Sequence, residues 1–284
     1  MTTHTLSTYQ STLLVMRKAL SVITDCPQLE AEILLAYALH ETRSHIIAWP
    51  DKHIEPEQLA YIENLTAKRS QGIPIAYILG EREFWSHELV VNKYTLIPRP
   101  ETECLVQLAL QKIPQISEYA VLDMGTGCGA VAIAIASERP QCKITAIDIS
   151  EKAISIAQQN ASRLGINNIT FIISDWYTHL AHQQYQIVVS NPPYIRENDS
   201  HLTQGDLRFE PKIALVAGKD GLDAIRTLVN DAHKYLVPGG WLIFEHGYDQ
   251  GQAVRLLLQQ ASFGHVKTYQ DLSIMDRVTC GQLM

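Results

Sequence analysis

The stretch of sequence that decides the fold is Tyr119-Ala-Val-Leu-Asp-Met-Gly-Thr-Gly-Cys-Gly129. An apolar run that ends in an acidic residue, Asp123, is typical of a buried strand, and the alternate glycines after it predict a sharp turn into a helix over residues 130–137. In an open α/β sheet, ligands bind in the crevice outside the carboxyl ends of the strands. The stretch therefore predicts a strand over residues 119–124 that leads into a ligand-binding loop.

Strands and helices alternate after this loop. The pattern predicts strands over residues 143–147, 169–173, 186–190 and 240–245, helices over residues 151–164, 221–235 and 250–260, and two short strands at the end of the chain. Because parallel strands need crossover connections, such alternation predicts βαβ units in a mostly parallel sheet.

The residues before the loop follow a different pattern. Apolar side chains at helical spacing predict helices near residues 13–22, 31–39 and 56–69, and alternation over residues 84–96 predicts a short hairpin. We therefore expect three parts: a helical domain over residues 1–75, a linker with a β-hairpin over residues 76–104, and an α/β domain over residues 105–284.

Composition limits the class of protein. The 284 residues are 46% hydrophobic and carry a formal net charge of −7, which fits a large domain plus a small one and counts against a protein that grips duplex nucleic acid through many phosphates. The five cysteines form no C-x-x-C pair, so we expect no metal site and reduced thiols. Without a signal-peptide pattern or a run of 18 apolar residues, we expect a cytoplasmic protein with no membrane span.

The acid in front of the glycines indicates the kind of cofactor. Asp123 would repel the pyrophosphate of a dinucleotide, but it suits a cofactor that carries a cationic amino group and a sulfonium, such as S-adenosylmethionine. The alternative for this loop is a nicotinamide cofactor. About 20 residues further on, the next strand ends in Asp148, whose carboxylate can accept both ribose hydroxyls. The alternative for Asp148 is a helix N-cap, although Ser150 is the better candidate for that role.

The third strand ends in Ser174-Asp175-Trp176. Trp176 can stack on an adenine and Asp175 can meet the edge of that base, whereas the alternative for Trp176 is packing in the core.

The most informative stretch is Asn191-Pro192-Pro193-Tyr194, which directly follows the fourth strand. The two prolines have no backbone donors, so the side-chain oxygen of Asn191 and the carbonyl of Pro192 remain as neighbouring acceptors. Two such acceptors suit a planar NH2 group, and Tyr194 offers a flat face for stacking. The alternative is a simple turn.

This pair of acceptors matches the chemistry of a poor nucleophile. The lone pair of an amide nitrogen is delocalised into its carbonyl, and two hydrogen bonds from the N–H groups favour pyramidalisation. The acceptors also hold the nitrogen in line with the sulfur–methyl bond. The loop therefore predicts methyl transfer to an amide or amine nitrogen without a metal or a strong base.

In this order along the chain, the Asp123–Gly129 loop and the Asn191–Tyr194 loop resemble those of the seven-stranded amino-methyltransferases. That resemblance implies a Rossmann-like sheet with a final antiparallel strand. Four further stretches resemble the release factor glutamine methyltransferases (the PrmC/HemK family), and with the two loops they extend the likeness to nearly the whole chain. They are Gly80-Glu-Arg-Glu-Phe-Trp85, Pro98-Arg-Pro-Glu-Thr-Glu103, Arg208-Phe-Glu-Pro211 and Glu245-His-Gly247.

The resemblance also implies a set of site residues. The cofactor site would comprise Asp123, Met124, Gly125, Thr126, Gly127, Asp148, Asp175, Trp176 and Asn191. The catalytic residues would be Asn191, Pro192 and Tyr194, and the substrate would be bound by Asn191, Pro192, Pro193, Tyr194, Arg99 and Glu101. Arg99, Glu101 and Glu103 would contact the substrate or support the loop that binds it, and the alternative is that they are charged residues on the surface without such a role.

The substrate implied by the resemblance is the glutamine of the Gly-Gly-Gln motif in class I peptide chain release factors, which the helical domain would grip. We expect a monomer that contacts neither nucleic acid nor membrane. The alternatives are a ribosomal-protein glutamine methyltransferase, a DNA or RNA adenine methyltransferase, which would have to extrude its base from a stack, and a binding module that has lost its chemistry.

Overall fold

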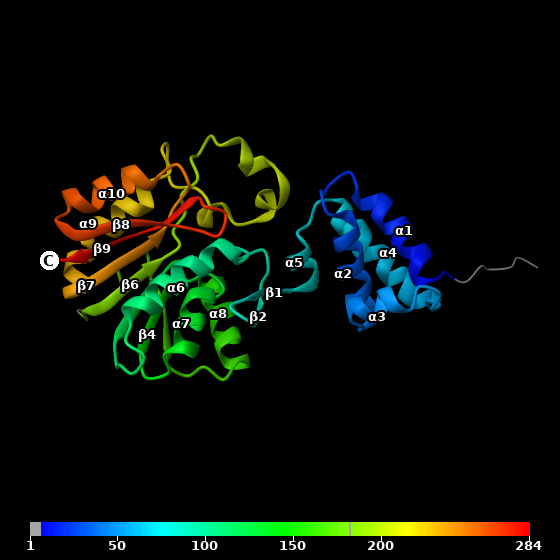
Figure 1. Ribbon diagram of the computed structural model, residues 1–284, viewed down its shortest axis with the longest axis horizontal. Coiled ribbons are helices and arrows are strands. Elements are labelled where there is room, and N and C mark those ends of the chain that lie inside the picture. Colours follow the sequence, from blue (N-terminus) through cyan, green and yellow to red (C-terminus); the bar gives the residue numbers. More distant parts are fainter. Residues whose placement is uncertain (1–6, 182) are drawn as a thin grey trace, which may run out of the picture. The chain divides into compact units, whose positions relative to one another are not determined.

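The computed structural model describes residues 7–181 and 183–284 (Figure 1). The chain divides into two compact units. The helical unit contains the described residues up to Gly80 together with His201–Phe209, and the sheet unit contains Glu81–Ser200 and Glu210–Met284. The sequence did not predict that the short segment His201–Phe209 groups with the amino-terminal helices.

The described part of the helical unit has five α-helices: α1 (Tyr9–Leu20), α2 (Pro27–Leu39), α3 (Arg43–Ala48), α4 (Pro56–Ser70) and α5 (Ile75–Leu79). The hydroxyl of Thr8 caps α1 by accepting from the backbone N–H of Ser11 at 3.2 Å, and prolines occupy the first turns of α2 and α4. The predicted helices are confirmed. The sequence pattern did not resolve α3 and α5, because five or six residues are too few to show a helical period.

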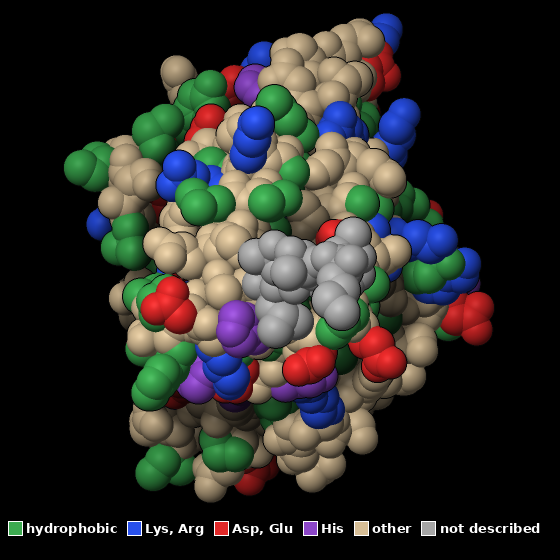
Figure 2. Space-filling view, turned by 90° about the vertical axis from the view of Figure 1, so that its right-hand side faces the viewer, with side chains coloured by type: hydrophobic (Ala, Val, Ile, Leu, Met, Phe, Trp, Pro, Cys, Tyr) green, Lys and Arg blue, Asp and Glu red, His purple; other side chains and the backbone are tan. Residues whose placement is uncertain are grey.

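Side chains from α1, α2, α3 and α4 form the core of this unit, with Leu20, Leu34, Ile46 and Leu65 among the most buried. Figure 2 views the molecule from the right-hand side of Figure 1 and shows hydrophobic, acidic, basic and histidine side chains intermixed over that face.

One buried cation ties the helical unit together. Arg69 on α4 donates to the Glu30 carboxylate of α2, with Nε 2.8 Å from Oε2, and its Nη1 lies 3.3 Å from Asp206. The same Nη1 donates to the backbone oxygens of Gly72 and Ile73. Arg69 therefore joins two helices and the His201–Phe209 segment.

The main sheet of the sheet unit has seven strands in the order β5-β4-β3-β6-β7-β9-β8. They are β3 (Ala120–Met124), β4 (Lys143–Asp148), β5 (Ile169–Ile173), β6 (Tyr185–Ser190), β7 (Leu236–Glu245), β8 (Phe263–Gln270) and β9 (Asp276–Leu283). The first five of these pair in parallel, and β9 runs antiparallel between β7 and β8. The predicted seven-stranded Rossmann-like fold is confirmed, but the last two strands have eight residues each and are not short.

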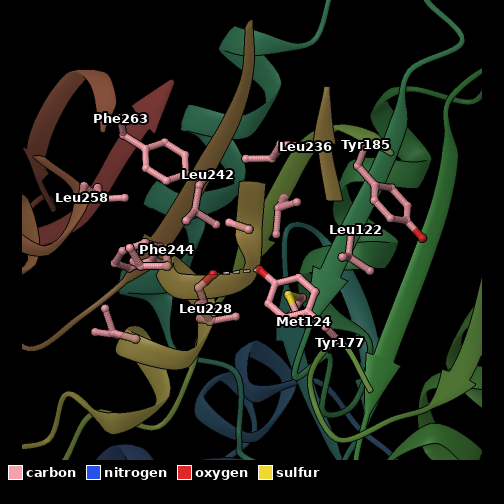
Figure 3. Close-up of a cluster of buried hydrophobic side chains, with 14 of the residues drawn as sticks. Leu122, Met124, Tyr177, Tyr185, Leu228, Leu236, Leu242, Phe244, Leu258 and Phe263 are labelled. Atoms are coloured by element: carbon pink, nitrogen blue, oxygen red, sulfur yellow. Dashed lines mark hydrogen bonds between the residues drawn. The ribbon is translucent and has the colours of Figure 1, made fainter. Parts of the chain in front are cut away.

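Helices cover the sheet. They are α6 (Glu103–Lys112), α7 (Ala130–Glu138), α8 (Glu151–Arg163), α9 (Asp223–Tyr235) and α10 (Gly251–Gln260). Leu122 and Met124 pack with α9 and α10 side chains in one large core (Figure 3), and the Tyr177 hydroxyl donates to the backbone oxygen of Leu228 at 2.9 Å inside it. Because side chains alternate along β3, Asp123 points to the opposite face, where α7 begins.

Two predicted elements were misplaced. The hairpin consists of β1 (Glu81–Phe84) and β2 (His87–Val90), so it begins before residue 84 and ends well before residue 96. Its turn residues, Trp85 and Ser86, both have positive φ, a conformation usually signalled by glycine or asparagine, so no residue type marks the turn there. The helix predicted from Gly221 begins at Asp223, because Gly221 itself has φ +78°. Helix α6 was not predicted from the sequence.

Among the described residues, no helix is long and apolar enough to cross a membrane.

Candidate active site

A cavity of about 420 Å³ opens at the carboxyl ends of β3, β4, β5 and β6. Nine of the predicted site residues line it: Asp123, Gly125, Thr126, Gly127, Asp148, Asp175, Trp176, Asn191 and Pro193. The other five, Met124, Pro192, Tyr194, Arg99 and Glu101, are outside the lining that the described residues form. Met124 instead packs in the core of the sheet.

The glycine loop leaves room for a ligand against its backbone. Gly125 and Gly127 have φ values of +72° and +57°, and a Cβ built on either glycine would meet no atom of the described chain within 4 Å. A side chain at either position would be strained and would project into open space. The loop is therefore a cradle that accepts a ligand close to the main chain.

Asp123 anchors this loop to α7. Its Oδ2 atom accepts from the Thr126 hydroxyl at 2.6 Å and from the backbone N–H of Ala132 at 3.2 Å. Burial raises the pKa of Asp123 to about 7, although these two hydrogen bonds oppose the shift. A cation bound in the cavity would favour the ionised form, so the carboxylate can respond to a cationic group of a cofactor.

The backbone holds both oxygens of Asp148. Oδ2 accepts from the N–H of Gly127 and Oδ1 from the N–H of Ser150, each at 2.9 Å. Burial raises the pKa of Asp148 and these bonds lower it. Ser150 is the N-cap of α8, as its hydroxyl accepts from the N–H of Ala153, so the N-cap alternative for Asp148 is wrong. A carboxylate oxygen can accept more than one hydrogen bond, which leaves capacity for a pair of hydroxyls.

Trp176 belongs to both the cavity and the core. It lines the cavity and packs against the cluster of Figure 3, so stacking and core packing are compatible. Its φ is +47°, and the Ser174 hydroxyl donates to its backbone oxygen at 2.7 Å, which stabilises this turn. Asp175 is exposed at the rim.

Asn191 has a defined orientation. Its Nδ2 donates to the hydroxyl oxygen of Thr102 at 3.1 Å. Since the two ends of an amide are told apart by their partners, this bond assigns the nitrogen to the Thr102 side and leaves Oδ1 as an acceptor. Thr102, which the sequence analysis did not single out, lines the same cavity.

Tyr194 is held at both ends. Its hydroxyl donates to Oε1 of Glu245 at 3.1 Å, and its backbone oxygen accepts from Nε2 of Gln250 at 3.0 Å. Burial, with the nearby Glu245 charge, raises the pKa of Tyr194 far above its ordinary value, so the phenol stays neutral. Tyr194 can therefore contribute a fixed ring rather than a proton acceptor.

The linker and the Arg208–Pro211 stretch meet through an ion pair. The Arg99 guanidinium contacts Oε1 of the buried Glu210, whose Oε2 accepts from the N–H of Ile97 at 3.0 Å. Arg99 is thus engaged in fixing this loop. Glu101 is half-buried, and the carboxylate of Glu103 accepts from the N–H of Trp85 at 3.3 Å.

Sequence reasoning missed Thr102, Glu210 and Glu245 as partners of the site residues. Each of them lies within a stretch that resembles the family, and this resemblance was the only feature of the sequence that could have indicated them. Across residues 7–181 and 183–284, no group of three or more His, Cys, Asp or Glu side chains is arranged to hold a metal ion.

The sheet and its loop define a class of protein. Residues 102–206 match the family model described as "Methyltransferase small domain". A solved methyltransferase from Pyrococcus furiosus has a TM-score of 0.53 at 16% identity, over 78% of this chain and 98% of that one, which shows a shared fold. The chain therefore has the fold and the family signature of a methyltransferase.

Close relatives specify the family. Residues 14–80 match the model described as "PrmC N-terminal domain". A release factor glutamine methyltransferase of Vibrio cholerae is 51% identical over 91% of both chains, and one of Escherichia coli is 45% identical over 94% of this chain and 97% of that one. This chain belongs to the release factor glutamine methyltransferase family, so the predicted family is confirmed.

Proposed function

We propose that this protein transfers a methyl group from S-adenosylmethionine to the side-chain amide nitrogen of a glutamine in class I peptide chain release factors, at their Gly-Gly-Gln motif. One observation carries the proposal: the glycine cradle and the oriented Asn191 line a single cavity. The relatives named above support the choice of substrate.

The residues present fit such a cofactor. Gly125 and Gly127 would lie against it, Asp148 would accept from its ribose hydroxyls, Trp176 would stack on its base with Asp175 at the base edge, and Asp123 would face its cationic end. When bound, S-adenosylmethionine supplies an activated methyl group on a sulfonium, and S-adenosylhomocysteine is the product. Met124 would contribute through its backbone alone, because its side chain is in the core.

The loop after β6 would hold the substrate amide. Oδ1 of Asn191 and the carbonyl of Pro192 would each accept one N–H of the glutamine NH2 group, Pro193 would line the pocket, and the fixed ring of Tyr194 would stack against the amide. These acceptors return electron density to the nitrogen and fix its direction of attack. Because the methylated nitrogen becomes more acidic as it forms its new bond, its proton can leave after transfer.

We further propose that residues 1–75 grip the release factor, that residues 76–104 form the linker beside the substrate pocket, and that residues 105–284 carry the chemistry. Within the linker, Arg99 would fix the chain through its ion pair with Glu210, and Glu101 would contact the segment of the release factor that carries the glutamine. A monomer working in the cytoplasm, with no nucleic acid or membrane partner, fits translation factors as substrates.

The test is methyl transfer from labelled S-adenosylmethionine to a purified class I release factor. The same factor with its Gly-Gly-Gln glutamine changed to alanine, and duplex DNA, are the matched controls. Label on the intact factor alone is the expected result. Label on the altered factor or on DNA, with none on the intact factor, would overturn the proposed substrate.

A further inference from the structure

Asn191 and Tyr194 both lead to one buried carboxyl group, that of Glu245. β6 and β7 are neighbouring parallel strands in which Ser190 pairs with Phe244. Asn191, the first residue after β6, and Glu245, the last residue of β7, therefore lie at the same edge of the sheet. Glu245 is only 1% exposed, and it is separate from the residues that line the cavity.

The first contact from Glu245 is direct. Its Oε1 accepts the hydroxyl of Tyr194 at 3.1 Å. The tyrosine hydroxyl therefore points into the protein, and the ring is fixed at its far end as well as at its backbone. A ring held in this way presents one face at a constant angle.

The second contact runs through Thr102. This residue stands at the N-cap position of α6, yet within the described chain its side chain makes no capping hydrogen bond. Its hydroxyl oxygen instead accepts from Nδ2 of Asn191, so its own proton is free for another acceptor. Ser190 pairs with Phe244, so the residues after them, Asn191 and Glu245, are neighbours, and Thr102, which is bonded to Asn191, lies beside the Glu245 carboxyl. In agreement with this placement, an interaction with Thr102 lowers the pKa of Glu245 against the effect of burial.

Glu245 is costly to keep in this place. Its Oε2 is buried and has no hydrogen-bond partner among the described residues. A buried carboxyl with incomplete partners destabilises a fold, and an apolar side chain of similar size would pack there more favourably. A polar group retained at such a cost is best explained by the side chains that it orients.

We propose that Glu245 is a positioning residue for methyl transfer, which sets the amide of Asn191 through Thr102 and the ring of Tyr194 through its hydroxyl. The inference rests on the proposed function. Glu245 offers acceptors to both hydroxyls, and Thr102 then accepts the Asn191 amide nitrogen. If that amide turned over, its NH2 would face the NH2 of the substrate, donor against donor.

The test compares kcat, the KM for the release factor, the Kd for S-adenosylmethionine and the unfolding midpoint in full-length variants. Thr102→Val removes the link to Asn191, and Glu245→Gln puts a donor beside one of the two hydroxyls. Each is expected to lower kcat about 10- to 100-fold, the effect of one mispaired buried group, with Kd unchanged within about threefold. Thr102→Ser keeps the hydroxyl and should therefore retain most of the wild-type kcat that Thr102→Val loses.

Two matched controls separate positioning from stability. Thr145→Val also removes a buried threonine hydroxyl, one that bonds to Tyr185, and Tyr235→Phe also removes a tyrosine hydroxyl, one that bonds to the backbone of Tyr177. Tyr194→Phe removes the hydroxyl that Glu245 accepts and should lower kcat as Thr102→Val does. Both controls should lower the unfolding midpoint about as much as their site counterparts, Thr102→Val and Tyr194→Phe, and leave kcat near that of the wild type.

Non-additivity is the last readout. If Glu245 acts through Thr102, the loss of kcat in the Thr102→Val, Glu245→Gln double variant should be smaller than the product of the two single losses. Full activity of both single variants would overturn the inference. So would losses of kcat that multiply in the double variant and parallel the fall in the unfolding midpoint. If the wild-type protein transfers no methyl group to the factor, the proposed function fails instead.

Discussion

Two opposing effects act on the carboxyl group of Asp123. The hydrogen bonds that anchor it to α7 favour the ionised form, whereas burial favours the neutral form and raises the pKa from an ordinary value of 3.8 to about 7. The folded state therefore holds this proton more tightly than the unfolded chain does. The contribution of Asp123 to the free energy of unfolding is greatest below about pH 4 and declines as the pH rises through about 7.

This titration predicts how cofactor binding depends on pH. A cationic cofactor favours ionised Asp123, so binding should expel a proton below pH 7, and the Kd for S-adenosylmethionine should fall as the pH rises from 5.5 to 7 and then level off. Calorimetry in buffers of different ionisation enthalpy measures both effects. Asp123→Asn is the control and should lose the slope; a slope that persists in this variant would assign it to another group.

Asn191 gives the most direct test of the chemistry. Asn191→Ala removes the acceptor for the substrate amide, so transfer should become undetectable while the Kd for S-adenosylmethionine stays within about tenfold. Equilibrium binding and single-turnover transfer measure the two quantities separately. Full activity of this variant would rule out the proposed mechanism.

At the scale of single residues, the sequence predicted those that line the cavity better than those that support them. Asp123, Asp148 and Asn191 each lie within one residue of the carboxyl end of a strand, and these ends meet at one edge of a parallel sheet, so their proximity could be predicted from order alone. The partner pairs Asn191–Thr102 and Tyr194–Glu245 are 89 and 51 positions apart. No local pattern specifies such pairs, because they depend on the register between strands and on which helix covers the sheet.

At the scale of elements, the apolar strands were predictable and the turns were not. The hairpin was misplaced because Trp85 and Ser86 adopt positive φ without a glycine. The start of α9 was misplaced because Gly221 serves the loop before it. A Cβ on Gly221 would overlap the backbone oxygen of Tyr194, so this glycine allows the Asn191–Tyr194 loop to pass close to α9.

Gly221→Ala should therefore displace the Tyr194 loop. We expect a loss of at least about 2 kcal/mol in the free energy of unfolding, from the strained φ and the overlap together, and a larger loss of transfer activity. Gly239→Ala is a close match, since its φ is +79° and the nearest atom to its Cβ would be 3.8 Å away. That control should lose about 1 kcal/mol and keep its activity; equal activity in the two variants would contradict the assigned role of Gly221.

At the scale of the whole molecule, the helical unit depends on a segment that lies far away in the sequence. Arg69 reaches Asp206 within this unit, and it also pairs with the half-buried carboxylate of Glu30. No sequence pattern predicted this contact, because Asp206 lies in a stretch without helical or strand periodicity.

Arg69→Met should destabilise the helical unit by about 3 kcal/mol, because it leaves the Glu30 carboxylate without its cation. Limited proteolysis should then cut faster within residues 201–209. Asp206→Asn is the milder counterpart, since Asp206 is 39% exposed at its side chain, and it should cost less than about 1 kcal/mol. Unchanged cleavage in the Arg69→Met variant would show that other contacts hold the segment.

The composition of the helical unit has a consequence for synthesis on the ribosome. The unit takes in His201–Phe209, so the chain passes between the two units at residues 80–81, 200–201 and 209–210. The amino-terminal helices leave the ribosome first, but they gain their last packing segment only after β3, β4, β5 and β6 have also been made. The first part to be translated is thus completed late, and a nascent chain shorter than about 210 residues has to wait for its final fold.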